Sequence, residues 1–346
     1  MKKRIGFLSF GHYQPARGSR TTTAQEALLQ SIELAVAAEE IGIDGAYVRV
    51  HHFAPQFAGP FPLLAAMAAR TRRIELGTGI IDMRYENPLS MAEQAAAADL
   101  ISSGRLQLGI SRGSQEPALR GYESFGFIPP EGSTDADMAR SHTELFRTAI
   151  AGQPVTMSDP KTSGVSRGLA IEPQSPGLAD RIWWGSATRA TAVWTAQQGM
   201  NLMSSTLLSE DTGIPFDELQ AEQIHVYRQT WKDVGHTHEP RISVSRSVLP
   251  ITTDEDRLYF GGRTEDTQDQ VGVLNGLRSR FGKTYVGEPD RIAEQLAADA
   301  AVRSADTVLL TVPNQLGVDY NARLLQTVAN YIAPALGWEP NLAYAP

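Results

Sequence analysis

The sequence predicts an α/β protein with the architecture of a (β/α)8 TIM barrel, with insertions after the fourth strand and before the eighth. Short aliphatic runs alternate with longer runs of helical periodicity about eight times, which is typical of a parallel sheet covered by helices. The turn after the first run, 11–15, has no Gly-x-Gly-x-x-Gly phosphate loop, which favours a closed barrel over an open doubly wound sheet. We expect one domain over residues 1–346.

The expected elements follow one another in a regular order. Thr23 and Glu26 form a capping box before the first helix, and Asn87-Pro88 is a second helix start, because asparagine caps a helix and proline suits its first position. The expected strands are Arg4–Phe10, Gly45–Val50, Arg73–Ile81, Arg105–Ser111, Arg181–Gly185, Asn201–Ser204, Arg241–Val248 and Asp306–Val312. The other expected helices are Pro60–Thr71, Asp135–Ala151, the stretch before Gly199, Phe216–Val234 and Asp319–Ile332. Residues 114–180 are rich in Pro, Gly and Ser around one of these helices, and we interpret them as a long excursion of the same domain.

Composition excludes several classes of function. Lys and Arg number 31 and Asp and Glu number 39, so the net charge is −8, which argues against binding to nucleic acid or to an anionic membrane. The absence of cysteine excludes disulfides, thiol nucleophiles, iron–sulfur clusters and cysteine-ligated zinc. No apolar run reaches the ~18–20 residues of a membrane span, and the run after Arg4 is too short for a signal peptide. We expect a soluble cytoplasmic protein.

Histidines follow the second expected strand, and a TIM barrel carries its active site at such strand ends. Adjacent strand residues point to opposite faces, so at most one of His51 and His52 enters the barrel mouth, and a shared metal is not expected. A catalytic histidine and a hydrogen-bonded structural histidine both remain open on spacing alone. His236 and His238 lie in a polar loop without an acidic partner nearby in sequence, so we predict no metal site.

Two further strand ends could hold an anion. Arg112 follows the fourth strand, where it could make a bidentate contact with an anion or pair with a loop carboxylate. Gly185-Ser186-Ala187-Thr188 opens a helix, with Thr191 one turn later, and helix starts bind phosphate, although ordinary N-capping explains the same residues. Asp82, Glu86 and Glu116 are interpreted as solvated loop acids.

The motifs taken together resemble the bacterial luciferase-like, flavin-dependent monooxygenase family, and the resemblance covers most of the chain. The segments that carry it are 41–48 leading to His51-His52-Phe53, 74–79 followed by Asn87-Pro88, 99–106 with Gly109 and Arg112-Gly113, 196–199 and Val286-Gly287-Glu288-Pro289. The resemblance implies a barrel that binds reduced FMN from a separate flavin reductase. It also implies reaction with O2 to a flavin C4a-peroxide, which oxygenates a small organic substrate.

The same resemblance assigns roles to individual residues. His51 matches the family's catalytic histidine, and Arg112, between Ser111 and Gly113, matches the side chain that holds the FMN phosphate. Thr188 and Thr191 match hydroxyl positions at the phosphate-binding helix start, beside Ala187. Gly79-Ile80 matches the place where the family often has a non-proline cis peptide beneath the flavin ring.

The chain also departs from the luciferases. Ser111 replaces a reactive cysteine, Ala187 replaces an acidic residue, and Thr206 falls where the alpha chain has a tryptophan, so we do not expect light emission. Residues 259–285 fall where the family places a mobile lid, although an ordinary surface excursion remains open. Alanine-rich stretches at 63–69 and 90–98 favour a homodimer, although they could equally pack on their own strands. Two alternative functions remain: deazaflavin-dependent hydride transfer, and flavin binding without catalysis.

Overall fold

Eight parallel strands form a closed barrel in the computed structural model, which describes residues 2–113, 116–210, 212–262, 268–274 and 277–342. Each strand pairs in parallel with the next around the ring, and the pairing of β10 with β8 closes it. The ring is made of β1 (Arg4–Ser9), β2 (Gly45–Val48), β3 (Glu75–Asp82), β4 (Leu106–Ser111), β7 (Ile182–Ser186), β8 (Asn201–Ser204), β10 (Ile242–Pro250) and β14 (Thr307–Val312). All eight strands were predicted from the sequence, with ends that differ by at most two residues, and the TIM-barrel prediction is confirmed.

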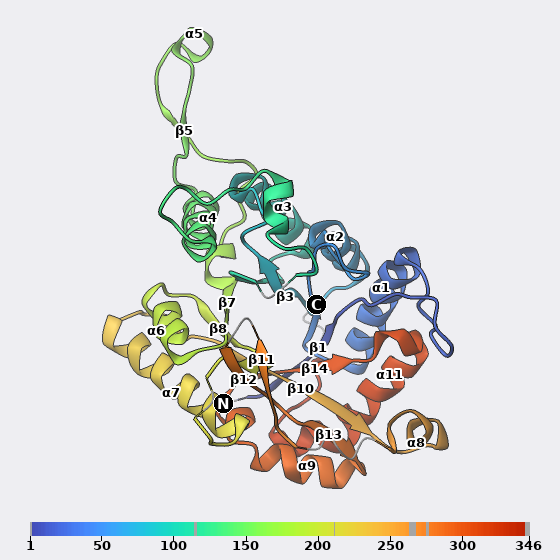
Figure 1. Cartoon of the computed structure of the whole chain (residues 1–346). Helices are drawn as coiled ribbons and strands as arrows, with labels where there is room; N and C mark the ends of the chain where they lie inside the picture. The colour runs from blue at the N-terminus through green and yellow to red at the C-terminus, as the bar shows by residue number, and fades with distance from the viewer. Residues whose placement is uncertain (1, 114–115, 211, 263–267, 275–276, 343–346) are drawn as a thin grey trace.

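Helices surround the barrel, as Figure 1 shows. They are α1 (Ala24–Ile41), α2 (Pro60–Arg70), α3 (Pro88–Ser102), α4 (Asp135–Ile150), α6 (Arg189–Gln197), α7 (Phe216–Val234), α9 (Pro289–Ala298), α10 (Ala300–Ser304) and α11 (Gly317–Thr327). The main core lies between these helices and the strands. A second apolar cluster of Leu8, Tyr47, Trp183, Met203 and Leu309 fills the barrel interior, because alternate residues of a strand point to opposite faces.

The helix boundaries follow the predicted caps. Thr23 and Glu26 form the expected capping box, and the side chain of Asn87 accepts hydrogen bonds from the next turn of α3. The bounds predicted for α7 are those observed. The last helix begins two residues earlier than predicted and passes into a π-helical turn, Val328–Ile332, which contacts α9.

The excursion after β4 leaves the barrel body. In addition to α4 it holds a short hairpin, β5 (Thr156–Met157) and β6 (Gly168–Leu169), with the one-turn helix α5 (Pro160–Ser163) at its tip. Figure 1 shows this hairpin projecting beyond α4. The prediction of a single helix in this stretch was therefore incomplete, because Asp159 caps a helix of only four residues, too short to show a periodicity.

The segment between β10 and β14 contains more structure than the sequence indicated. It holds α8 (Asp254–Phe260), the antiparallel strands β11 (Gln270–Leu274) and β12 (Leu277–Phe281), and β13 (Thr284–Gly287), which extends the sheet beside β10. β12 also pairs with β9 (Leu207–Leu208), so a small second sheet forms. The range predicted as a lid, 259–285, includes the strands β11 and β12 of this sheet. Its residues 263–267 and 275–276 lie outside the described part of the chain. In the described ranges, every helix is too short or too polar to cross a bilayer.

Candidate active site

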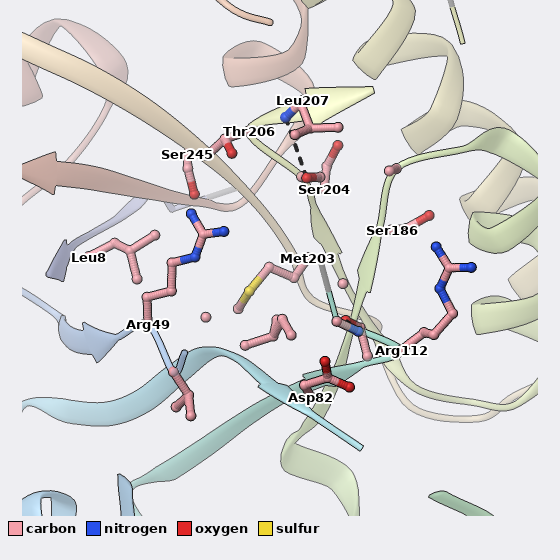
Figure 2. A pocket seen from close by; sticks show the side chains of 18 of the residues that line it. Leu8, Arg49, Asp82, Arg112, Ser186, Met203, Ser204, Thr206, Leu207 and Ser245 are labelled. Atoms are coloured by element: carbon pink, nitrogen blue, oxygen red, sulfur yellow. Dashed lines mark hydrogen bonds between the residues drawn. The ribbon is translucent and has the colours of Figure 1, made fainter. Parts of the chain in front are cut away.

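A cavity opens at the carboxyl ends of the barrel strands, where parallel strands bring their following loops together (Figure 2). It encloses about 1050 Å3 of space not filled by protein atoms, part of it open to solvent. The predicted site residues that line it are His51, Gly79, Ile80, Ser111, Arg112, Gly113 and Ala187. Residues from β1, β8 and β10 complete the wall.

Thr188 and Thr191 lie outside this lining. Thr188 is the N-cap of α6: its hydroxyl accepts a hydrogen bond from the backbone N–H of Thr191 and donates one to the Thr191 hydroxyl, at 2.9 Å. The N-capping that the sequence left open is therefore present. Both hydroxyls nevertheless remain at the helix start that borders the cavity through Ser186 and Ala187.

His51 points into the barrel mouth, and its partner is Glu116. The Nδ1 atom of His51 lies 2.8 Å from Oε2 of Glu116, and the two side chains are 10% and 3% exposed. The interpretation of Glu116 as a solvated loop acid was wrong, because the loop after β4 folds back over the cavity and buries this carboxylate. Hydrogen bonding at Nδ1 leaves Nε2 as the ring nitrogen that can act on a ligand.

His52 points the other way, as predicted, although both histidines lie beyond the end of β2 at Val48. Its ring stacks on Tyr85 with 4.2 Å between centroids, and Phe125 meets its edge. Burial among these rings lowers the pKa of His52. His52 therefore packs in an aromatic cluster outside the cavity, and only His51 enters it.

Asp82 is also buried, so the interpretation of it as a solvated acid was wrong. Arg84 donates to both of its carboxylate oxygens, at 2.6 to 3.1 Å, and also reaches Asp135. Burial raises the pKa of Asp82 against the opposing effect of Arg84. Gly113, at φ +84°, rests on this carboxylate, and a Cβ there would collide with it. The Asp82–Arg84 pair thus fixes the turn that presents Arg112.

Glu86 differs from a solvated acid as well. Burial, followed by the charge of Asp82, raises the pKa of Glu86 to about 7. The loop between β3 and α3 is packed against the excursion after β4, and sequence reasoning places such loops in solvent by default.

The floor of the cavity is apolar and tightly packed. The peptide bond between Gly79 and Ile80 is cis, as the resemblance implied. A Cβ on Gly79 would lie 3.1 Å from Leu8 and 3.5 Å from the sulfur of Met203, and a Cβ on Gly109 would collide with the carbonyl of Thr78. Only glycine allows the strands to approach so closely here. Ile80 and Met203 supply apolar side chains to this part of the cavity lining.

Arg112 stands at the edge of the cavity near the N-terminus of α6. Its side chain is exposed, and within the described residues its guanidinium has no carboxylate partner. Ser186 lies on the same side of the cavity in Figure 2, and Arg49 on the opposite side. A guanidinium with no carboxylate partner in the described part of the chain, beside a helix N-terminus, is a chemically suitable site for a phosphate group.

A buried polar network supports this helix start from below. Gln220 and Gln223 of α7 share the hydroxyl of Ser204, at 2.9 and 2.5 Å, and Gln223 also donates to the carbonyl of Thr188 at 3.1 Å. Arg246 donates to Gln220 at 2.8 Å and forms a two-bond ion pair with Asp299. The network runs from α10 to the loop that carries Ser186 and Ala187.

The sequence analysis did not single out Glu116 as a partner, nor Arg49, Gln220 and Gln223. Three of these, Arg49 and the two glutamines, had a signal in the sequence. Arg49 is a charge in the otherwise apolar run Gly45–Val50, and the two glutamines fall on the apolar face of α7. Glu116 had none, because its distance from His51 is set by the closure of the barrel.

A closed barrel with a polar cavity over its strand ends defines a TIM-barrel enzyme. Residues 8–306 match the family described as luciferase-like monooxygenase. A flavin-dependent trigonelline monooxygenase, oxygenase component, from Acinetobacter baylyi is 34% identical over 288 residues, 82% of this chain and 72% of that protein. An F420-dependent glucose-6-phosphate dehydrogenase from Amycolatopsis mediterranei is 32% identical over 301 residues, 83% of each chain.

Solved structures have the same fold. The oxygenating constituent of 3,6-diketocamphane monooxygenase from Pseudomonas putida, in complex with FMN, superposes with a TM-score of 0.69 at 18% identity, over 96% of this chain and 99% of that one. The chain therefore belongs to the luciferase-like monooxygenase family. It is an enzyme of the flavin-dependent oxidoreductase and monooxygenase class, in which relatives use either a flavin or F420.

Proposed function

We propose that the protein is a monooxygenase that takes reduced FMN from a separate reductase and uses O2 to oxygenate a small organic substrate. The observation that carries this proposal is that one cavity is lined by two groups of residues. Arg112 and the start of α6 lie at one side of it, and the His51–Glu116 pair lines the same cavity. A phosphate-bearing cofactor anchored at Arg112 would extend over the strand ends toward His51. The oxygenase-component relative supports a separate reductase.

The residues present fit FMN. Arg112 and the backbone N–H groups at Ser186 and Ala187 would hold the phosphate, with Thr188 and Thr191 at the same helix start. The cis Gly79–Ile80 peptide and Met203 would support the ring. When bound, reduced FMN supplies the electrons that activate O2.

The protein's own contribution to the chemistry centres on His51. Glu116 holds Nδ1, so the imidazole is fixed in orientation and Nε2 can hold or move a proton at a substrate or cofactor atom. The sheet of β9, β11 and β12 adjoins the cavity through Leu207, and we propose that it excludes water as a lid. Reduced flavin is oxidised wastefully in open water, so such exclusion serves oxygen transfer.

Hydride transfer with a deazaflavin is the second candidate, favoured by the F420-dependent relative that matches 83% of this chain. The two candidates differ in their need for O2. An anaerobic titration with reduced FMN, followed by rapid mixing with aerated buffer, separates them. Tight binding and reoxidation of bound FMN that is slower than that of free FMN would support the monooxygenase. Tight binding of F420, together with no binding of reduced FMN, would instead support hydride transfer. Binding of either cofactor without any turnover would favour a flavin-binding protein.

We also propose a homodimer formed through α2 and α3. Most of their alanines face the protein's own core, as Ala68, Ala92 and Ala95 do, whereas Ala69 is exposed and Leu100 and Ile101 stand out on α3, 47% and 52% exposed. Small residues next to exposed aliphatic ones suit close helix packing between copies. Light scattering at increasing protein concentration, with Ile101→Glu as the disrupting variant, checks the state of assembly.

A further inference from the structure

The start of α6 already holds a carboxylate of this chain. The backbone N–H of Arg189, the first residue of the helix, donates to Oε2 of Glu210 at 3.1 Å, and Nε of Arg189 lies 3.3 Å from the same oxygen. α6 has nine residues and no acid in its own first turn, so this charge comes from a segment 21 residues further along the chain. The first N–H groups of a helix and the positive end of its dipole favour a carboxylate in this place.

Glu210 lies next to residues that we assign to the phosphate end of the proposed cofactor. The N–H of Ser209 donates to the carbonyl of Ala187 at 3.0 Å, and both of these residues line the cavity. Glu210 follows directly after Ser209, and its side chain is 25% exposed, so water screens its charge only in part. The carboxylate and a phosphate at Ala187 would therefore share one end of α6.

Arg189 does not cancel the charge at this helix start. Its Nη1 atom also lies 2.9 Å from Oε2 of Glu222, so one cation faces two carboxylates. A phosphate group binds the same kind of N–H groups as a carboxylate does, and like charges in such proximity repel each other. A phosphate that binds at Ala187 must displace the carboxylate of Glu210 or bear its repulsion, and either event weakens the binding.

The segment that carries Glu210 also belongs to the small second sheet. Leu207 and Leu208 of β9 pair with Phe281 and Arg280 of β12, which lies in the range proposed as a lid. The proposed lid and the phosphate end of the cavity are therefore joined through residues 207–210.

We propose that Glu210 is an affinity-determining residue of the phosphate end. Its carboxylate occupies the N-terminus of α6, competes with the phosphate group of the cofactor and so keeps the cofactor exchangeable. The inference rests on the proposed function for the identity of that cofactor, because an oxygenase that receives reduced FMN from a separate reductase also has to release oxidised FMN after each turnover. The competition itself is a binding property, and it can be measured without any substrate.

Titration of the full chain with FMN, riboflavin and inorganic phosphate tests the competition. Glu210→Gln keeps an oxygen that can accept from the N–H of Arg189 but removes the charge. We expect this variant to bind FMN about tenfold more tightly, mainly through slower dissociation, and to bind riboflavin as the parent does. Inorganic phosphate, followed by the rise in Tm that it causes, should also bind more tightly.

Glu222→Gln is the matched control. It removes a charge from the same guanidinium, but Glu222 contacts the outer Nη1 atom and not the N–H of the helix start. We expect its FMN affinity to stay within about twofold of that of the parent, because an exposed ion pair contributes little.

Three results would overturn this role of Glu210. They are an affinity for FMN and phosphate that is unchanged or lower in Glu210→Gln, an equal gain in Glu222→Gln, which would reflect net charge alone, and an equal gain for riboflavin, which has no phosphate. If Glu210→Gln fails to fold, Glu210→Ala removes the same charge and carries the same comparison. If neither the parent nor the variant binds a flavin while inorganic phosphate binds more tightly to the variant, the proposed function fails and the competition stands.

Discussion

Oε2 of Glu116 lies 2.8 Å from Nδ1 of His51, although 65 residues separate them in sequence. The pair joins the end of β2 to the loop after β4, so it forms only when the barrel closes. Because both side chains are nearly buried, the contact fixes the orientation of the imidazole toward the cavity.

Replacing His51 with Ala should abolish product formation and leave flavin binding unchanged, because the ring acts on protons and does not reach the phosphate end. Glu116→Gln keeps a hydrogen-bond partner but removes the charge, and we expect kcat to fall by about 10–100-fold at unchanged flavin affinity. Steady-state turnover with a flavin titration measures both. If the His51→Ala variant turns over at an unchanged rate, His51 has no role in the reaction.

Arg112→Ala should weaken the binding of FMN by about tenfold or more and leave the binding of riboflavin almost unchanged, because only FMN carries the phosphate. Fluorescence titration with the two flavins gives the comparison within one variant. Arg70→Ala, which removes an exposed arginine of α2 that is paired with Glu33, serves as the control. Equal weakening of both flavins by Arg112→Ala would show that the phosphate lies elsewhere.

The network beneath α6 gives a prediction for Gln223. Gln223→Leu removes one buried hydrogen-bond partner from the hydroxyl of Ser204 and one from the carbonyl of Thr188, which keep Gln220 and Ser186 respectively. We therefore expect a loss of about 1–3 kcal/mol in the free energy of unfolding. Because the loop of Ser186 and Ala187 loosens, FMN affinity should fall as well. Gln229→Leu, at an exposed position of the same helix, is the control. If Gln223→Leu lowers the free energy of unfolding but leaves the FMN affinity of the folded protein unchanged, the network has only a structural role.

The raised pKa of Glu86 leads us to expect that the stability of the protein depends on pH. Its pKa is about 7 in the folded protein, above the ordinary value of 4.5, because burial and Asp82 disfavour the charged form. The folded state thus holds the proton more tightly than the unfolded chain, and this contribution to stability is lost as the pH rises from about 4.5 to 7. Glu86→Gln should be more stable than the parent at pH 8, by roughly 1–3 kcal/mol, and about equal at pH 4.5. Denaturant titrations at the two pH values decide, and a pH-independent difference contradicts the assignment.

Much of the fold could be predicted from the sequence because its signals are local. The capping box at Thr23, the Asn87-Pro88 start and the apolar periodicity of Phe216–Val234 lie within single elements, and the structure confirms them. The strands β5, β6 and β9 escaped prediction because each has only two residues, and β9 forms only by pairing with the distant β12, as Leu207 pairs with Phe281. Their sequences carry no alternation of their own. The hairpin of β11 and β12 was not predicted either.

The candidate site divides in the same way. Strand ends can be located by counting along the chain, so His51, Ile80 and Arg112 were placed at the barrel mouth from the sequence. The sequence also predicted that at most one of His51 and His52 enters the barrel mouth, and only His51 lines the cavity, although both residues follow the end of β2. Only the tertiary structure decided that Glu116 is the partner of His51, that Asp82 is neutralised by Arg84, and that Arg49 shares the cavity with both. Those relationships are distances between segments far apart in the chain, and they are set by the closure of the ring.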